Sequence, residues 1–164
     1  MGWYAMAIVD VLDFLPASHR AWERIVTIFA RMIQALLLVQ DKNTGLWYQI
    51  LDRGGYEGNY AEASASCMFV YALAKGIRKG YLTSNCLEAA QRGYAGIIKH
   101  LVEVNGYGQV NLLMTCDSVG LGGKQRRDGS YKYYIDEPVV TNDLKGVGTF
   151  LLAGVEMERL CRSA

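Results

Sequence analysis

The chain has 164 residues, of which 51% are hydrophobic and 20% are charged, and its net charge at pH 7 is +1. This length and composition predict a single globular domain over residues 1–164 and exclude a disordered chain. The balanced charge argues against a general nucleic-acid or membrane-surface binder. No apolar run reaches the roughly 18 residues of a membrane span, and the acidic start, with Asp10 and Asp13, is unlike a signal peptide.

Three helices are predicted in the first half of the chain. The first covers about 2–14 and ends at Leu15-Pro16. The second covers about 19–40, with Ser18 as its N-cap and an apolar face at three- and four-residue spacing. The third covers about 60–78 and is ended by Lys79-Gly80.

Two further helices are predicted in the second half. One covers about 85–102 with a regular apolar stripe, and the other covers about 144–161 with Asp143 as its cap. Strands are expected to be few, and residues 46–51 and 131–135 are candidates for short extended segments.

The helices alternate in character. The first, third and fifth carry small residues on several faces, which is typical of helices buried on all sides, whereas the second and fourth are ordinary amphipathic helices. This pattern predicts an all-α fold of αα-hairpins, with inner and outer helices forming part of a toroid. The inner-to-outer connections are short, and the long loops, about 41–59 and 103–143, should emerge together as one working face.

The sulfur and imidazole side chains do not form a metal site in this pattern. The four cysteines, Cys67, Cys86, Cys116 and Cys161, contain no CxxC pair, and the two histidines are isolated. We expect free thiols in a reducing compartment, a cytoplasmic protein, and no metal site.

The long loops combine aromatic with planar polar residues, which suits a sugar ligand. The first holds residues 44–49 (TGLWYQ) and 57–60 (EGNY); the second holds residues 120–123 (GLGG) and 126–131 (RRDGSY). The alternative is that these aromatic side chains only pack the loops onto the helices. The glycine run at 120–123 is not a phosphate loop, because the Lys-Ser/Thr ending and the strand-to-helix context are missing.

Two acidic residues of this face are candidates for a catalytic acid and base, namely Glu62 and Asp128. Glu62 equally fits a structural role as a first-turn acid that favours the helix dipole. A Ser-His-Asp triad is not indicated, because neither histidine falls on the long-loop face.

Five segments, in order along nearly the whole chain, resemble a known family. They are residues 2–7 (GWYAMA), 44–49 (TGLWYQ), 62–66 (EASAS), 120–123 (GLGG) and 127–131 (RDGSY). Together they resemble the C-terminal half of glycoside hydrolase family 105, the unsaturated rhamnogalacturonyl hydrolases, which are related to the unsaturated glucuronyl hydrolases.

The resemblance implies an (α/α)6 barrel, of which about five helices are present here as an incomplete toroid. It implies a pectin-derived oligosaccharide with a 4,5-unsaturated galacturonosyl unit, typically linked to rhamnose, which is cleaved by hydration of the enol-ether double bond. One aspartic acid would protonate C4 and then help water add at C5, without a cofactor. In the family pattern that aspartate precedes the Gly-Trp-Tyr motif, so the chain alone is expected to be inactive.

The resemblance also implies substrate-binding residues. Trp3 would line the sugar pocket, and Arg127 would pair with a uronate carboxylate. The remaining candidates are carried by the matching loop motifs: Trp47, Tyr48, Gln49, Asp128, Ser130 and Tyr131.

Three functions therefore remain open: a segment of a pectin-degrading hydrolase, a non-catalytic glycan-binding protein, and a purely structural fragment. An incomplete ring leaves apolar surface exposed on its first and last inner helices. Because monomers rarely expose large apolar patches, we expect self-association through these surfaces.

Overall fold

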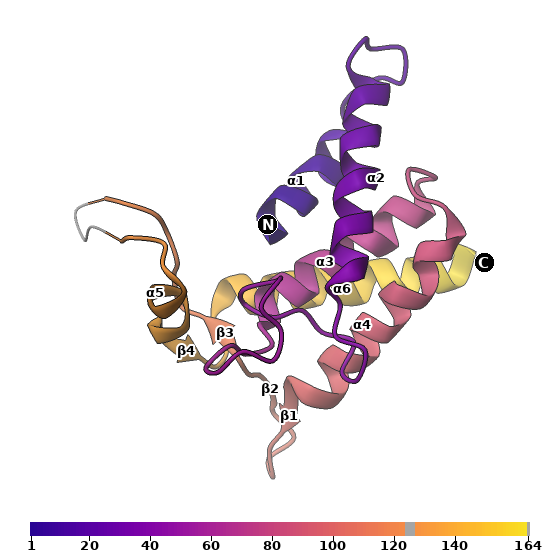
Figure 1. The fold of residues 1–164 in the computed structure, drawn as a ribbon. Coiled ribbons are helices and arrows are strands. Elements are labelled where there is room, and N and C mark those ends of the chain that lie inside the picture. Colours follow the sequence, from indigo (N-terminus) through magenta and orange to yellow (C-terminus); the bar gives the residue numbers. More distant parts are fainter. Residues whose placement is uncertain (124–126, 164) are drawn as a thin grey trace.

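Helices dominate the computed structural model, which describes residues 1–123 and 127–163 (Figure 1). Within these residues the α-helices are α1 (Gly2–Val11), α2 (Trp22–Leu38), α3 (Ala63–Arg78), α4 (Leu87–His100), α5 (Tyr131–Asp136) and α6 (Leu144–Ser163), with a 3-10 turn at Ser84–Cys86. None of the described helices is long and apolar enough to cross a bilayer.

Four short strands form two antiparallel pairs in the second long loop. β1 (Val102–Val104) pairs with β2 (Val110–Leu112), and β3 (Thr115–Cys116) pairs with β4 (Val139–Val140). The pairs satisfy backbone polar groups of this loop.

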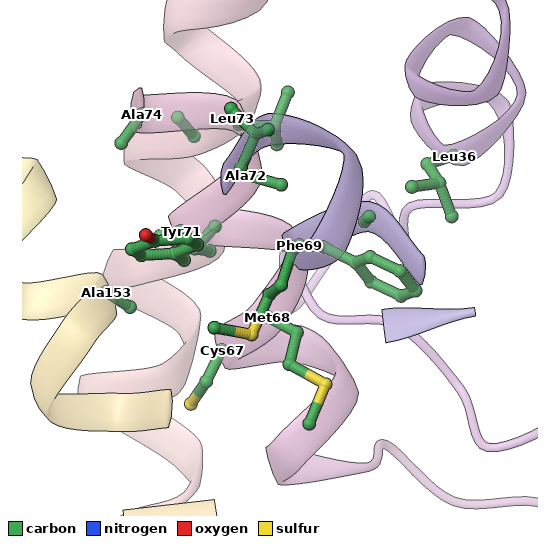
Figure 2. Close-up of a cluster of buried hydrophobic side chains, with 14 of the residues drawn as sticks. Leu36, Cys67, Met68, Phe69, Tyr71, Ala72, Leu73, Ala74 and Ala153 are labelled. Carbon is green, nitrogen blue, oxygen red and sulfur yellow. The ribbon is translucent and has the colours of Figure 1, made fainter. Parts of the chain in front are cut away.

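The central helix of the fold is α3, which packs against α1, α4 and α6. Nearly every residue from Ala63 to Gly76 is buried. Figure 2 shows the core around it, where Ala153 of α6 lies beside the α3 side chains. Helices α3 and α6 run side by side in the same direction (Figure 1), so α1, α3 and α6 form an inner layer.

Helices α2 and α4 form the outer layer and are buried on one face only. Glycines allow a close contact between α3 and α2 and another between α4 and the first long loop. A Cβ on Gly76 of α3 would lie 2.8 Å from the Phe29 ring of α2, and a Cβ on Gly96 of α4 would lie 2.1 Å from the Thr44 carbonyl oxygen. The predicted alternation of inner and outer helices is confirmed, and the layer is an open arc.

The two long loops meet at the N-terminal end of α3, as predicted. The Tyr131 hydroxyl donates to the Glu57 carbonyl oxygen at 2.9 Å, and the Gln49 side-chain amide donates to the Cys116 sulfur at 3.3 Å. The first loop is closed by a bridge between Tyr48 and Ala61. The long loops therefore form one face.

Three local predictions were wrong. Residues 131–135 form helix α5, because the Ser130 hydroxyl accepts from the Tyr133 N–H at 3.1 Å and so caps a helix that aromatic composition alone did not favour. Ser18 does not cap α2, whose N-cap is Ala21. The fold is also not purely all-α, because the second long loop contains the four strands.

Charged side chains join the inner helices at the end opposite the long loops. The Lys75 ammonium of α3 contacts Asp10 at 2.6 Å and Asp13 at 2.8 Å, and Arg78 makes a two-pronged contact with Glu156 of α6 at 2.7 and 2.9 Å. Burial alone would lower the pKa of Lys75, but hydrogen bonds to Asp10, Asp13 and Tyr71 outweigh it and raise the pKa.

Because of this charge cluster, we expect the folded state to lose stability in acid. Hydrogen bonds from Lys75 and Lys79 lower the pKa of Asp13 from its ordinary 3.8. The stabilisation that ionised Asp13 gives to the folded state is therefore complete above pH 3.8, and it is lost as the pH falls through the lower folded-state pKa. Asp13→Asn should be less stable than wild type at pH 7, and urea titrations should show the difference disappearing in strong acid. A difference that does not change with pH would contradict this assignment.

A second prediction concerns the turn before Leu46. Gly45 has φ +75°, and a Cβ there would lie 2.4 Å from the Arg92 carbonyl oxygen. Gly45→Ala should cost about 3 kcal/mol of unfolding free energy, from left-handed strain and displacement of α4. Gly55 has φ +79° with open space around it, so Gly55→Ala is the control and should cost about 1 kcal/mol. Chemical denaturation measures both variants, and equal losses of unfolding free energy would contradict the packing role of Gly45.

Candidate ligand cavity at the long-loop face

A cavity of about 610 Å³ lies between the start of α1, the two long loops and the start of α6. Its volume falls within the range of small-molecule sites. The side chains with ligand-binding chemistry that line it are Trp3, Tyr48, Gln49, Asp52, Arg53, Glu62, Cys116, Tyr131, Tyr134 and Lys145. Both long loops contribute, so the predicted working face is hollowed into one site.

Trp3 is presented to the cavity by the first turn of α1. Its side chain is 60% exposed. The preceding Gly2 is buried against α3, where a Cβ would lie 2.5 Å from the Met68 sulfur. The close crossing at Gly2 thus fixes the indole at the mouth of the cavity, where a flat aromatic face is available to the C–H face of a sugar ring.

Glu62 lies at the base of the cavity and is almost fully buried. Its carboxylate accepts from the backbone N–H groups of Ser64 at 3.2 Å, Ala65 at 2.5 Å and Cys116 at 3.0 Å, and from the Ser64 hydroxyl at 2.8 Å. It caps α3 and holds β3 against it. These contacts occupy both carboxylate oxygens, so the structural role foreseen as the alternative is the one observed.

Aromatic and cationic side chains form the rim of the cavity. The Arg53 guanidinium donates to the Tyr56 hydroxyl at 3.2 Å and lies 5.2 Å from the centre of the Tyr56 ring. The Tyr56 ring in turn lies 6.2 Å from that of Tyr131, across the two loops. Arg53 keeps a side-chain exposure of 48%, so its remaining donors are accessible to an anionic ligand.

Lys145 contributes the second cation of the cavity, from the first turn of α6. Its ammonium contacts the Asp143 carboxylate at 2.9 Å and the Asp117 carbonyl oxygen at 2.7 Å. Asp143 also accepts from the Lys145 N–H at 2.9 Å, as expected of the predicted cap. Neither Arg53 nor Lys145 was singled out from sequence. Arg53 could have been found from its position, because it follows the end of the TGLWYQ motif by four residues in the same long loop.

The thiol of Cys116 faces this cavity without being reactive. Burial raises its pKa, an effect partly opposed by hydrogen bonds with Tyr60 and Gln49. Burial likewise raises the pKa of the Tyr60 hydroxyl. Both groups are therefore protonated at neutral pH, and Cys116 is one of the residues that line the cavity.

The structure corrects the prediction for Trp47. Its side chain is fully buried, its indole N–H donates to the Leu36 carbonyl oxygen at 2.8 Å, and its ring packs edge-on against Phe69 at 5.4 Å. The indole belongs to the core and is not available to a ligand. Its neighbours Tyr48 and Gln49 do line the cavity, as does Tyr131.

The Arg127 loop is placed differently from expectation. Arg127, Asp128 and Ser130 line a separate, shallower hollow. The Arg127 guanidinium packs on Gly120 and donates to the Gly122 carbonyl oxygen at 3.3 Å. Arg126, part of the same motif, lies outside the described residues.

The structure does not support Glu62 and Asp128 as a catalytic pair. They line different cavities. Hydrogen bonds from Ser130 lower the pKa of Asp128 and keep it ionised, the opposite of what a general acid needs. Within residues 1–123 and 127–163, no cluster of His, Cys, Asp or Glu has a metal-binding arrangement.

Fold and cavity together define a protein of the helical-hairpin toroid class, with a cavity at the long-loop end. The family model for Glycosyl Hydrolase Family 88 matches residues 1–161. Protein Atu3128 of Agrobacterium fabrum is 39% identical over 171 residues, covering 99% of this chain and 71% of its own length. The chain therefore belongs to Glycosyl Hydrolase Family 88.

Solved structures agree with this assignment. A family 105 glycoside hydrolase of C. acetobutylicum ATCC 824 superposes with a TM-score of 0.94 at 47% identity, covering 96% of this chain and 44% of that one. A possible family 105 member from Salmonella enterica gives a TM-score of 0.80 at 28% identity, with coverage of 96% and 38%. The chain thus spans less than half the length of these solved relatives, and the predicted resemblance to family 105 is confirmed.

The Glu62 contacts predict a mainly structural phenotype. Glu62→Ala removes the acceptor for three backbone N–H groups and should lower the free energy of unfolding by roughly 3 kcal/mol. Glu57 is exposed and contributes its backbone carbonyl oxygen to the contact with Tyr131, so Glu57→Ala is the matched control and should change stability by less than about 0.5 kcal/mol. Urea denaturation of both variants provides the measurement, and a Glu62 variant as stable as the control would contradict the capping role.

Proposed function

We propose that this chain forms the substrate-binding portion of a pectin-degrading glycoside hydrolase of the unsaturated rhamnogalacturonyl type. The ligand would be a 4,5-unsaturated galacturonosyl-rhamnose, cleaved by hydration of the enol-ether double bond. Family membership and the family 105 structures support the reaction class. The observation that carries the ligand proposal is one cavity lined by an exposed indole, Trp3, and by two cations, Arg53 and Lys145.

Each chemical feature of this ligand has a counterpart in the cavity. The uronate carboxylate would pair with Arg53, whose planar fork matches a carboxylate and whose side chain remains half exposed. The sugar face would stack on Trp3. The Gln49 amide and the Tyr131 and Tyr134 hydroxyls supply polar groups for sugar hydroxyls.

We also propose that the chain by itself binds without turnover. Protonation at C4 needs a carboxylic acid that is protonated in a dry site. Among the described residues, the carboxylates lining the cavity are Glu62, whose oxygens are occupied by N–H donors, and Asp52, whose side chain is 75% exposed. Neither meets that requirement. A non-catalytic glycan-binding role is the second candidate, favoured by the same observation.

A cytoplasmic location is part of this proposal. The cysteines Cys67, Cys86 and Cys116 are buried free thiols, and Cys161 is an exposed one. Free thiols are typical of proteins in a reducing compartment.

The ligand proposal is tested by tryptophan fluorescence during titration with unsaturated galacturonosyl-rhamnose. Trp47 is buried and Trp22 packs against Tyr81 at 6.1 Å, so the ligand-dependent change should come from Trp3. Trp3→Ala should abolish that change and weaken binding about fivefold in calorimetry, in line with the loss of about 1 kcal/mol of stacking. Tyr107→Ala, on the exposed tip between β1 and β2, is the control and should bind normally.

The lack of turnover is tested in the same solutions by following the ultraviolet absorbance of the double bond. The absorbance should stay constant with the chain alone. Steady loss that Asp52→Asn or Glu62→Gln abolishes would show that an acid of this chain performs the reaction. Binding that is unaffected by Trp3→Ala would contradict the assignment of the cavity.

A further inference from the structure

The part of the first long loop that carries Arg53 is a chain of turns, here called the rim loop (residues 50–59). The Arg53 N–H donates to the Ile50 carbonyl oxygen, and the Arg53 carbonyl oxygen accepts from the Tyr56 N–H, both at 3.1 Å. The Tyr56 carbonyl oxygen in turn accepts from the Asn59 N–H at 3.1 Å. Each turn therefore sets the position of the next.

The side chain of Asn59 ties these turns together. Its amide oxygen accepts from the Ile50 N–H at 3.1 Å, and its amide nitrogen donates to the carbonyl oxygens of Ile50 at 2.9 Å and Arg53 at 2.8 Å. Both donors of the amide are thus used within the loop. Asn59 is not among the residues that line the cavity, so its role lies in the shape of the rim loop.

The turns that Asn59 ties together also aim the Arg53 side chain. The guanidinium donates to the Tyr56 hydroxyl at 3.2 Å and lies 5.2 Å from the centre of the Tyr56 ring. The Tyr56 N–H bonds to the same Arg53 carbonyl oxygen that accepts from Asn59. Arg53 and the ring that supports it are therefore placed by one set of hydrogen bonds.

The second long loop holds only the outer end of the rim loop. A Cβ on Gly58 would lie 2.8 Å from the Ile135 side chain of α5, and the Tyr131 hydroxyl donates to the Glu57 carbonyl oxygen at 2.9 Å. These contacts fix the loop on the side of α5. The turn at Arg53 is held from within the loop, and exposed turns with few contacts open easily.

We propose that Asn59 is a positioning residue that sets the preference of the cavity for a carboxylate. This inference rests on the proposed function, in which Arg53 pairs with the uronate carboxylate. A two-pronged pair requires the guanidinium to lie in one orientation relative to the carboxylate. A rim loop that is no longer tied weakens this pair and leaves the stacking on Trp3 in place, so Asn59 acts on charge selectivity through Arg53.

Calorimetry with two ligands, unsaturated galacturonosyl-rhamnose and the methyl ester of its carboxylate, measures this selectivity. The wild-type chain should bind the acid about tenfold more tightly than the neutral ester, as expected of hydrogen bonds to a charged group. Asn59→Ala and Arg53→Ala should each remove most of this preference, while the affinity for the ester stays within about twofold. The double variant should lose no more than Arg53→Ala alone, because both changes act on one contact.

Asn105→Ala is the matched control. Asn105 also organises an exposed loop, since its side-chain oxygen accepts from the N–H groups of Tyr107 and Gln109 at 3.0 Å each, and it does not line the cavity. This variant should keep the full acid preference. Asn59→Ser, which keeps a hydroxyl donor on a shorter side chain, should lose part of the preference and replaces Asn59→Ala if circular dichroism shows that the latter does not fold.

Amide hydrogen exchange without ligand tests the same role in the loop itself. Exchange at Arg53 and Tyr56 should be faster in Asn59→Ala than in wild type and unchanged in Asn105→Ala. Unchanged exchange, or a full acid preference in Asn59→Ala when Arg53→Ala has lost it, would overturn the positioning role and leave the proposed function intact. Equal affinity of the wild-type chain for acid and ester would overturn the ligand assignment of Arg53 and this inference with it.

Discussion

The carboxylate of Glu62 is the interaction on which the ligand site depends. It accepts from two N–H groups of the first turn of α3 and from the Cys116 N–H of β3, while its own backbone N–H donates to the Trp47 carbonyl oxygen at 2.9 Å. One buried acid thus joins both long loops to the central helix. The sequence alone allows a catalytic role for this acid. In the structure, its carboxylate accepts backbone hydrogen bonds that hold the walls of the cavity together.

The inner layer has a different means of support at each end. At the long-loop end, hydrogen bonds and close glycine contacts hold irregular segments against helices. At the other end, paired charges link Asp10 and Asp13 of the α1 region, Lys75 and Arg78 of α3, and Glu156 of α6. Lys75 and Glu156 are the buried members of these pairs, so removing a partner would leave a buried charge uncompensated. The ligand-facing end can therefore carry exposed aromatic and cationic groups while the opposite end keeps the helices aligned.

The helices and their layering were predictable because small-residue and amphipathic helices have different periodic patterns. The joint face of the long loops followed from connection lengths alone. Trp47 could not be assigned, because an indole in a loop motif fits a core as well as a cavity until its hydrogen bond to Leu36 is known. Arg53 was missed and Arg127 favoured for a related reason: the direction of a loop side chain depends on contacts between segments far apart in sequence. Helix α5 was missed because the Ser130 cap outweighs aromatic composition.

These features describe a family 88 chain with one cavity, lined by exposed aromatic and cationic side chains from both long loops and from the starts of α1 and α6. The central claim is that both long loops form a single ligand site. Amide hydrogen exchange, measured with and without unsaturated galacturonosyl-rhamnose, tests it most directly. Exchange should slow together in residues 48–53, 116–123 and 127–134. Slowing in one loop alone, or only at the opposite end around Lys75 and Arg78, would contradict the account.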